Sequence, residues 1–431
     1  MRLAAQVLAV AVAVLAGCGG GAPPRPAPAA SQVSSGLARG APGVTEATVS
    51  QDVVEAFGRG DFARAASHLD ERARPANGAA EASLRDAWEA ITRDVGQYRG
   101  IERLGTTTGL GFVLVTVRCK TDAAAFEVRL VFHGPRRPPA APAASSVTIS
   151  YAWDPPAYAD ATRFHDDGTV IGAGKDALPG NLVVPVGPGP FPAVVLVPSP
   201  ALDRDGTVGG VKMYRDVAWG LASAGIVSIR YDARARNGAA GAPAARGQGG
   251  QGQAEARDPA LDAAAAVAVV RKLATVDKGR VFLAGHGEAA RVALAAAGAI
   301  EDKKLAGLAL LGPAPLKARS LDAKALRRTQ VPIFAARGDR DATLSTADWR
   351  AWKRALLWRP KTTTASMVGY NHFFVPVSAG TADASADDCR KPANVGHDLV
   401  DVLARVVGAG ATPAAGQAAA KPTASSQGAR R

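Results

Sequence analysis

Three short stretches in the second half of the chain hold residues whose types and spacing bear on chemistry. Asp341 lies in RGDRD, three residues after Gly338 and after an apolar run, and His372 lies in YNHFF. The third stretch, VFLAGHGEAARVAL (281–294), reads as a buried strand, a tight turn and a small-residue helix, with Gly287 at the apex. An imidazole or a carboxylate can exchange protons, whereas glycine has no side chain that attacks another atom. These stretches thus contain an acid, a base and a turn without a reactive group.

The elements that must position these residues begin at about Arg163. Short apolar runs such as FPAVVLVP, GIVSIRYD, GRVFLAG, LAGLALLG and VPIFAAR alternate with helical segments such as MYRDVAWGLASAG and PALDAAAAVAVVRKLATV. Strands alternating with helices predict an α/β domain with a mostly parallel sheet and helices on both faces. Active sites in such sheets lie at the carboxyl ends of the strands.

A different pattern occupies residues 45–153. Helical periodicity places Leu84, Trp88, Ile91 and Val95 on one face, and the period then changes to two in GFVLVTVRCK, AAFEVRLVF and SSVTISYAW. Helices followed by an antiparallel sheet predict an α+β domain. The order resembles the small cone-shaped domains of the nuclear-transport-factor and cystatin type. Since no catalytic constellation is present in it, we expect binding or spacing from this domain rather than chemistry.

Residues 163–408 resemble a bacterial α/β-hydrolase family of the dienelactone-hydrolase and acyl-peptidase kind. The resemblance rests on five segments in order: VVLVPSPALDRDGTVG, YRDVAWGLASAGIVSIRYD, VFLAGHGEAA, ARGDRDATLSTADWRAWKRAL and GYNHFF. It implies an α/β-hydrolase fold with a nucleophile, an acid and a histidine in that chain order. Asp341 stands at the acid position and His372 at the histidine position. The simpler alternatives are that Asp341 is a solvated residue of a surface turn and that His372 is an ordinary loop residue.

The nucleophile position departs from the family pattern. Gly285 to Ala289 occupy the G-x-S-x-G positions, and Gly287 replaces the serine, which closes the acyl-enzyme route. The position of His286 is often occupied by a histidine in the family, and we expect this side chain to pack beneath the turn. Glu288 is expected to begin the helix, where the dipole favours a carboxylate and where its charge opposes a developing oxyanion. Glycine suits a strained elbow because it adopts such angles with little cost.

The second part of the oxyanion region also departs from the family. A glycine-containing stretch is replaced by VPSPA (197–201), in which Pro198 and Pro200 have no N–H to donate. Ser199 lies between them and is a candidate displaced nucleophile, although the histidine would then have to be re-aimed. The helical cap expected between LLG and VPIF is reduced to PAPLKARSLDAKALRRTQ, which predicts a cleft more open to water.

The N-terminus of the chain carries export features, and both ends are expected to be disordered. Residues 1–17 combine Arg2 with an apolar run too short to span a bilayer, and LAGC follows, which resembles the lipobox of bacterial lipoproteins. The resemblance implies lipidation of Cys18; the alternative is an ordinary secretory signal that happens to contain a cysteine. Residues 18–44 predict a disordered tether and residues 409–431 a disordered tail. We expect an exported lipoprotein of the cell membrane or outer membrane, facing the periplasm or the exterior.

The charge and cysteine content of the chain limit the classes of partner and cofactor that we expect. The net charge is +13, but its Lys and Arg residues are scattered, and no basic stripe with aromatics predicts nucleic-acid binding. The charge suits a solvated surface, anionic lipid headgroups or cell-wall polymers. Cys119 and Cys389 form no disulfide framework and no metal spacing, so we expect neither a metal nor a cofactor. We expect a monomer.

The missing serine leaves three functional hypotheses. The favoured one is a membrane-anchored pseudoenzyme that binds a small molecule, a cell-wall fragment or a protein, or acts as a scaffold. The second is an active carboxylic-ester or peptide hydrolase in which His372, oriented by Asp341, activates water directly. The third is a structural envelope protein whose cleft has no role.

Overall fold

The computed structural model describes residues 44–71, 73–74, 79–109, 111–133, 141–200, 202–234, 258–300, 305–316, 321–359, 361–377 and 389–408. The expected signal peptide (1–17), Cys18, the tether apart from Val44, and the tail (409–431) lie outside these ranges. The chain divides into two compact units, the first containing residues up to Asp154 and the second most of the residues from Pro155 onward. In the ranges above, no helix combines the length and apolar character needed to cross a bilayer.

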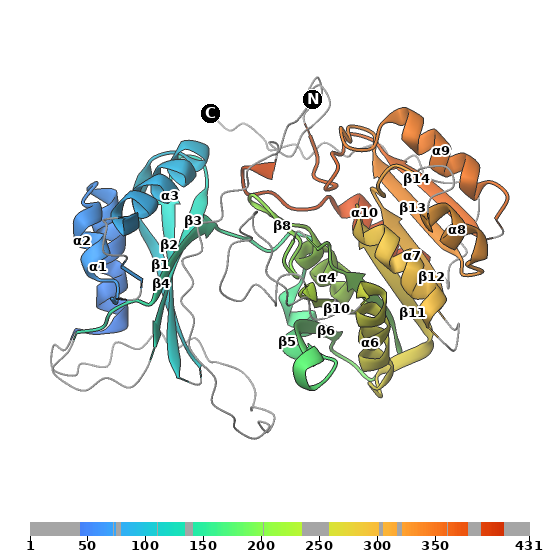
Figure 1. Ribbon diagram of the computed structural model, residues 1–431, viewed down its shortest axis with the longest axis horizontal. Helices are drawn as coiled ribbons and strands as arrows, with labels where there is room; N and C mark the ends of the chain where they lie inside the picture. Colours follow the sequence, from blue (N-terminus) through green and yellow to red (C-terminus); the bar gives the residue numbers. More distant parts are fainter. Residues whose placement is uncertain are drawn as a thin grey trace, which may run out of the picture. The chain divides into compact units, whose positions relative to one another are not determined.

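The first unit is an α+β domain in which three helices precede a four-stranded sheet (Figure 1). The helices are α1 (Glu46–Gly58), α2 (Phe62–Ser67) and α3 (Ala79–Val95). The strands β1 (Tyr98–Gly109), β2 (Phe112–Thr121), β3 (Ala125–His133) and β4 (Ser146–Tyr151) pair in sequence order, all antiparallel. Alternate residues such as Val117, Val128 and Leu130 are buried against Trp88 and Phe57 of the helices, as the period of two predicts.

The second unit is built around an eight-stranded sheet of order β14-β13-β12-β11-β7-β10-β6-β5. β5 and β6 are antiparallel to their neighbours, and the other six strands are parallel. The strands are β5 (Phe164–Ile171), β6 (Leu178–Pro185), β7 (Phe191–Val197), β10 (Val227–Tyr231), β11 (Val276–His286), β12 (Gly307–Leu311), β13 (Ile333–Gly338) and β14 (Thr362–Met367). A short hairpin joins β8 (Thr207–Val208) to β9 (Val211–Lys212).

Helices cover both faces of this sheet (Figure 1). Residues of α6 (Pro259–Arg271), α7 (Ala289–Ala299), α8 (Leu321–Arg328) and α9 (Thr346–Leu356) share one buried core with the sheet. Residues of α4 (Met213–Ser223) and α10 (His397–Gly408) share the other. The 3-10 turns η1 (Ala161–Arg163) and η2 (Gly174–Asp176) flank β5.

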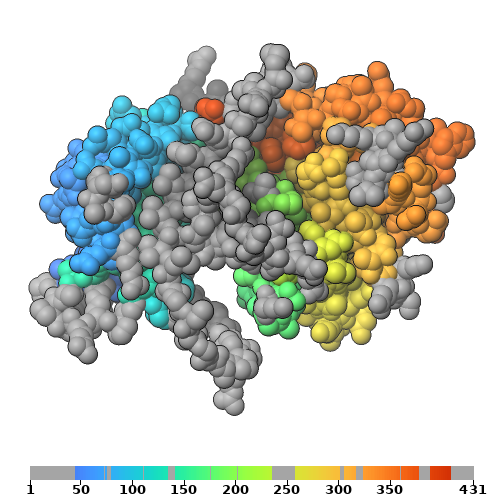
Figure 2. All heavy atoms as spheres, in the orientation of Figure 1, coloured from blue at the N-terminus to red at the C-terminus, as the bar shows by residue number. Residues whose placement is uncertain are grey.

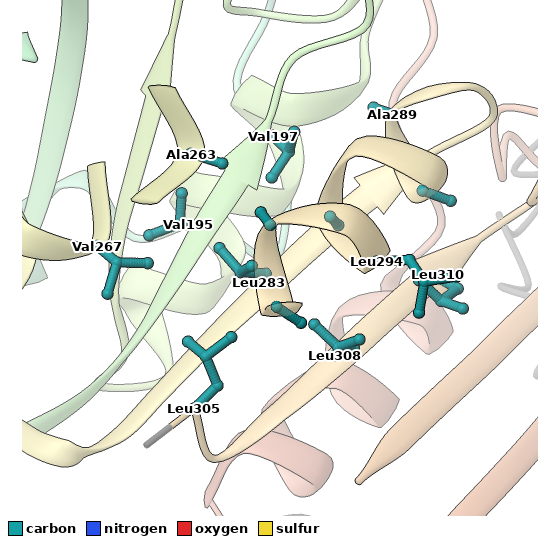
Figure 3. Close-up of a cluster of buried hydrophobic side chains, with 14 of the residues drawn as sticks. Val195, Val197, Ala263, Val267, Leu283, Ala289, Leu294, Leu305, Leu308 and Leu310 are labelled. Carbon is teal, nitrogen blue, oxygen red and sulfur yellow. The ribbon is translucent and has the colours of Figure 1, made fainter. Parts of the chain in front are cut away.

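The central strands are apolar on both faces because helices cover both. Leu283 of β11 and Val195 of β7 meet Ala263 and Val267 of α6 and Leu294 of α7 in one cluster (Figure 3). The unit has an α/β-hydrolase fold. This fold is defined by the strand order, by the two antiparallel strands at one edge, and by the sharp turn that connects β11 to α7. The expected fold is therefore confirmed, with a small α+β region in front of it.

Candidate active site

The turn after β11 keeps the backbone geometry of a nucleophile elbow. Gly287 has φ +58° and its N–H donates to the carbonyl of Leu311 at 2.9 Å. A Cβ at Gly285 would lie 2.3 Å from the carbonyl oxygen of Ala289, so only glycine allows α7 to approach β11 this closely. The sharp strand-to-helix turn is thus present, and the residue at its apex has no side chain.

Asp341 and His372 form a hydrogen-bonded pair. The Nδ1–H of His372 donates to Oδ2 of Asp341 at 2.8 Å, because a carboxylate can only accept. Oδ1 of Asp341 accepts from the backbone N–H groups of Thr343 and Leu344 at 2.7 and 2.9 Å. Burial acts to raise the pKa of Asp341, but the hydrogen bond and charge of His372 and these two N–H groups lower the pKa below its usual value. The carboxylate therefore stays ionised and holds the imidazole in one tautomer.

The free nitrogen of this imidazole faces the apex of the turn. A Cβ placed on Gly287 would lie 3.7 Å from Nε2 of His372. Among the described residues, no other heavy atom beyond its chain neighbours would lie within 4 Å of it. Because Nδ1 carries the proton, Nε2 of neutral His372 presents a lone pair. The structure thus brings the three sequence-predicted residues together, with open space where a hydroxyl would stand.

His286 supports this arrangement from beneath. It is buried, its Nε2–H donates to the carbonyl oxygen of His372 at 2.9 Å, and its backbone N–H donates to the hydroxyl of Tyr214 at 2.9 Å. That hydroxyl in turn donates to the carbonyl of Val197 at 2.8 Å. Burial, aided by the charge of His372, lowers the pKa of His286 to about 3. His286 is consequently neutral near neutral pH and positions the loop of His372.

Two further residues of the site were missed from the sequence. Gly312 follows β12 with φ +46°, and a Cβ there would lie 3.2 Å from Nδ1 of His372 and 3.3 Å from Nε2 of His286. Asn371 is buried and its Oδ1 accepts from the N–H groups of Phe373 and Val375 at 3.0 Å each. An asparagine directly before the histidine was a local signal for such a turn, whereas Gly312 gave none.

Glu288 and Ser199 occupy different parts of the oxyanion region. Glu288 is the N-cap of α7, and its carboxylate, 60% exposed, pairs with Arg291 at 3.1 Å. Its backbone N–H has no hydrogen-bond partner among the described residues, so one oxyanion donor remains. Ser199 follows β7 and its carbonyl accepts from the N–H of Leu202 at 3.1 Å. In the described part of the chain no hydrogen bond joins Ser199 to His372, so the displaced-nucleophile hypothesis gains no support.

The segment between β12 and β13 contains α8 as its single described helix, consistent with the reduced cap. Cys119 and Cys389 are buried, and neither forms a disulfide with a described residue. Within the described ranges, no group of three or more His, Cys, Asp or Glu side chains is arranged to hold a metal ion. The fold is hydrolase-like, and the structure places the hydrogen-bonded pair of Asp341 and His372 beside Gly287 at the apex of the turn.

One part of the chain is similar in sequence to a known esterase. No family model matches the chain. A segment of 80 residues is 42% identical to Esterase EstD of Thermotoga maritima; it spans 18% of this chain and 18% of that esterase.

Solved structures similar to this chain include dienelactone-hydrolase-like α/β serine hydrolases. An α/β serine hydrolase without a lid from Xanthomonas campestris is 20% identical, with 57% of this chain and 93% of that chain covered and a TM-score of 0.37. Dienelactone hydrolase from Anabaena variabilis is 16% identical, with coverages of 56% and 96% and a TM-score of 0.38.

Proposed function

We propose that this chain is a hydrolase-like lipoprotein of the cell envelope that has lost covalent catalysis and acts by binding a ligand or as a scaffold. The observation that carries the proposal is the bare apex of the elbow: no atom at Gly287 can form a bond with an acyl carbon. The pair of Asp341 and His372 is then an inherited feature, retained because its hydrogen bond ties the loop of His372 to the loop of Asp341.

A second candidate is supported by the open space at the same position. A water molecule in the place of the missing hydroxyl would stand beside Nε2 of His372, which can accept its proton while Asp341 stabilises the imidazolium. The N–H of Glu288 would contact the oxyanion. Such a site hydrolyses reactive esters directly, without a covalent intermediate.

Ester turnover by the full chain, compared with a His372→Ala variant, separates the two candidates. The proposal predicts that p-nitrophenyl acetate is hydrolysed at the same background rate by both proteins. A rate that falls at least about tenfold in His372→Ala would show that His372 activates water, and would replace the first candidate by the second.

The membrane attachment has its own test. We propose that Cys18 carries the lipid, as the LAGC sequence implies. Cells grown with an alkyne fatty acid should yield labelled protein in the membrane fraction, and Cys18→Ser should lose the label. Equal labelling of both proteins would refute lipidation at Cys18.

A further inference from the structure

The end of α9 exposes the two most solvent-accessible large apolar side chains of the described residues. Leu357 is 70% exposed and Trp358 is 88% exposed. The orange α8–α9 region that contains them lies at the surface (Figure 2). Single exposed apolar residues are common, but two adjacent ones that include a tryptophan are not explained by chance exposure alone.

The fold does not require these two side chains. α9 already buries Trp349, Trp352 and Leu356 against the sheet, and Nε1–H of Trp352 donates to the carbonyl of Ala314 at 3.0 Å. Leu357 forms the C-cap of α9, and Trp358 follows it. Neither side chain belongs to the buried face of the helix. Their apolar character therefore contributes little to folding.

Four cations lie in the last turns of the two helices near this apolar pair. Lys353 and Arg354 lie exposed in the last turn of α9, and Arg327 and Arg328 lie exposed in the last turn of α8. The guanidinium of Arg359 donates to the carbonyls of Leu326 and Thr329, which holds the two helix ends together.

The charge in the last turns of these two helices is of one sign. None of the four cations forms an ion pair with a described residue. No acidic residue occurs in the sequence between Trp349 and Met367.

Ordinary helix physics explains only part of this pattern. Lys and Arg are favoured in the last turn of a helix because they interact with the dipole, but the dipole does not favour an exposed tryptophan. A nucleic-acid surface would need several aromatics for stacking, and here there is one. Tryptophan beside lysine and arginine is the composition of membrane–water interfaces, where the indole lies at headgroup level and cations attract anionic lipids.

We propose that Arg327, Arg328, Lys353, Arg354, Leu357 and Trp358 form a docking surface for an anionic lipid bilayer. Trp358 and Leu357 enter the interface, and the four cations face lipid phosphates. The surface sets the orientation of the hydrolase-like unit on the membrane. This inference depends neither on loss of catalysis at Gly287 nor on the chemical state of Cys18.

Quenching of tryptophan fluorescence by brominated acyl chains tests the contact directly. The full chain is reconstituted in vesicles of phosphatidylglycerol and phosphatidylcholine with brominated tails. We expect quenching in the wild type that is lost in Trp358→Phe, because phenylalanine keeps the apolar contact but removes the reporter. Equal quenching in both proteins would place Trp358 away from the bilayer and overturn the proposal, leaving the surface to a protein partner.

Charge reversal tests the role of the cations. Lys353→Glu/Arg354→Glu should reduce the quenching of Trp358 at least threefold, and so should pure phosphatidylcholine or 1 M salt. The matched control is Lys272→Glu/Lys278→Glu, two exposed lysines next to α6 and within β11, which should leave the quenching unchanged. If both double variants reduce it equally, net charge rather than this surface is responsible, and the proposal fails.

Discussion

The two halves of the candidate site differ in the functional groups that they present. On one side, Asp341 and His372 are joined at 2.8 Å, the carboxylate is fixed by two backbone N–H groups, and His286 holds the loop from beneath. On the other side, the elbow has its backbone but no side chain at Gly287. The comparison teaches that packing and hydrogen bonds hold the histidine and the turn in a defined geometry without a side chain at the apex of the turn.

Restoring the hydroxyl should have the largest effect. Gly287→Ser places Oγ beside Nε2 of His372, so turnover of p-nitrophenyl acetate should rise about 10²-fold or more over wild type. Gly287→Ala is the matched control without a hydroxyl, and Gly287→Ser/His372→Ala should lose the gain. No gain in the serine variant would show that the intact half is not catalytically competent.

The next largest effect concerns stability and pH at His286. Its pKa is about 3 in the folded chain and about 6.5 in the unfolded chain. Between these values the unfolded chain binds a proton that the folded chain does not, so stability falls on acidification, by up to about 1.4 kcal/mol per pH unit.

Urea unfolding of wild type and His286→Gln between pH 7 and pH 4 measures how much His286 contributes to the pH dependence of the unfolding free energy. The difference in unfolding free energy should be constant above pH 6.5, and below it the wild type should lose stability faster than the variant. Parallel pH profiles would mean that His286 is protonated in the folded state, against the account of the site.

A smaller effect is expected from backbone strain at the elbow. Gly287→Ala forces a Cβ onto a residue with φ +58°, which should lower the unfolding free energy by about 1–3 kcal/mol. Gly298→Ala in α7 is the control, since its Cβ meets open space and alanine favours a helix. Thermal unfolding of both should show a loss only at Gly287; an unchanged melting temperature there would mean that the turn relaxes.

The smallest effect belongs to Glu288. In the Gly287→Ser background, Glu288→Gln should raise kcat/KM roughly twofold to fivefold, because removing an exposed charge next to the oxyanion donor favours the negative transition state. Arg291→Gln, which frees the carboxylate from its partner, should act in the opposite direction. A decrease with Glu288→Gln would assign the carboxylate a catalytic role instead.

Most of the fold could be predicted from the sequence, because the periodicity of apolar residues and the alternation of strands and helices depend on local burial. Val117, Val128 and Leu130 of the first unit and Val195 and Leu283 of the second were readable in this way. Chain order and spacing also pointed to Asp341, His372 and Gly287.

Contacts between segments far apart in the chain could not be predicted from the sequence. Three such contacts join segments more than twenty residues apart. Gly312 leaves room for the rings of His372 and His286, the hydroxyl of Tyr214 accepts from the backbone N–H of His286, and His286 donates to the carbonyl of His372. No period or local motif encodes such contacts. Glu288 was expected to begin the helix and lies at the N-cap of α7, whereas the pairing of its carboxylate with Arg291 was not predicted.

The central claim is that a positioned base faces a position without a nucleophile. Intact-mass measurement after treatment with a fluorophosphonate tests it most directly, on the wild type, Gly287→Ala and Gly287→Ser. The account predicts one phosphonate adduct on Gly287→Ser, located at residue 287, and none on the other two. An adduct on the wild-type protein at Ser199 or any other side chain would show that the chain retains a nucleophile and would contradict the account.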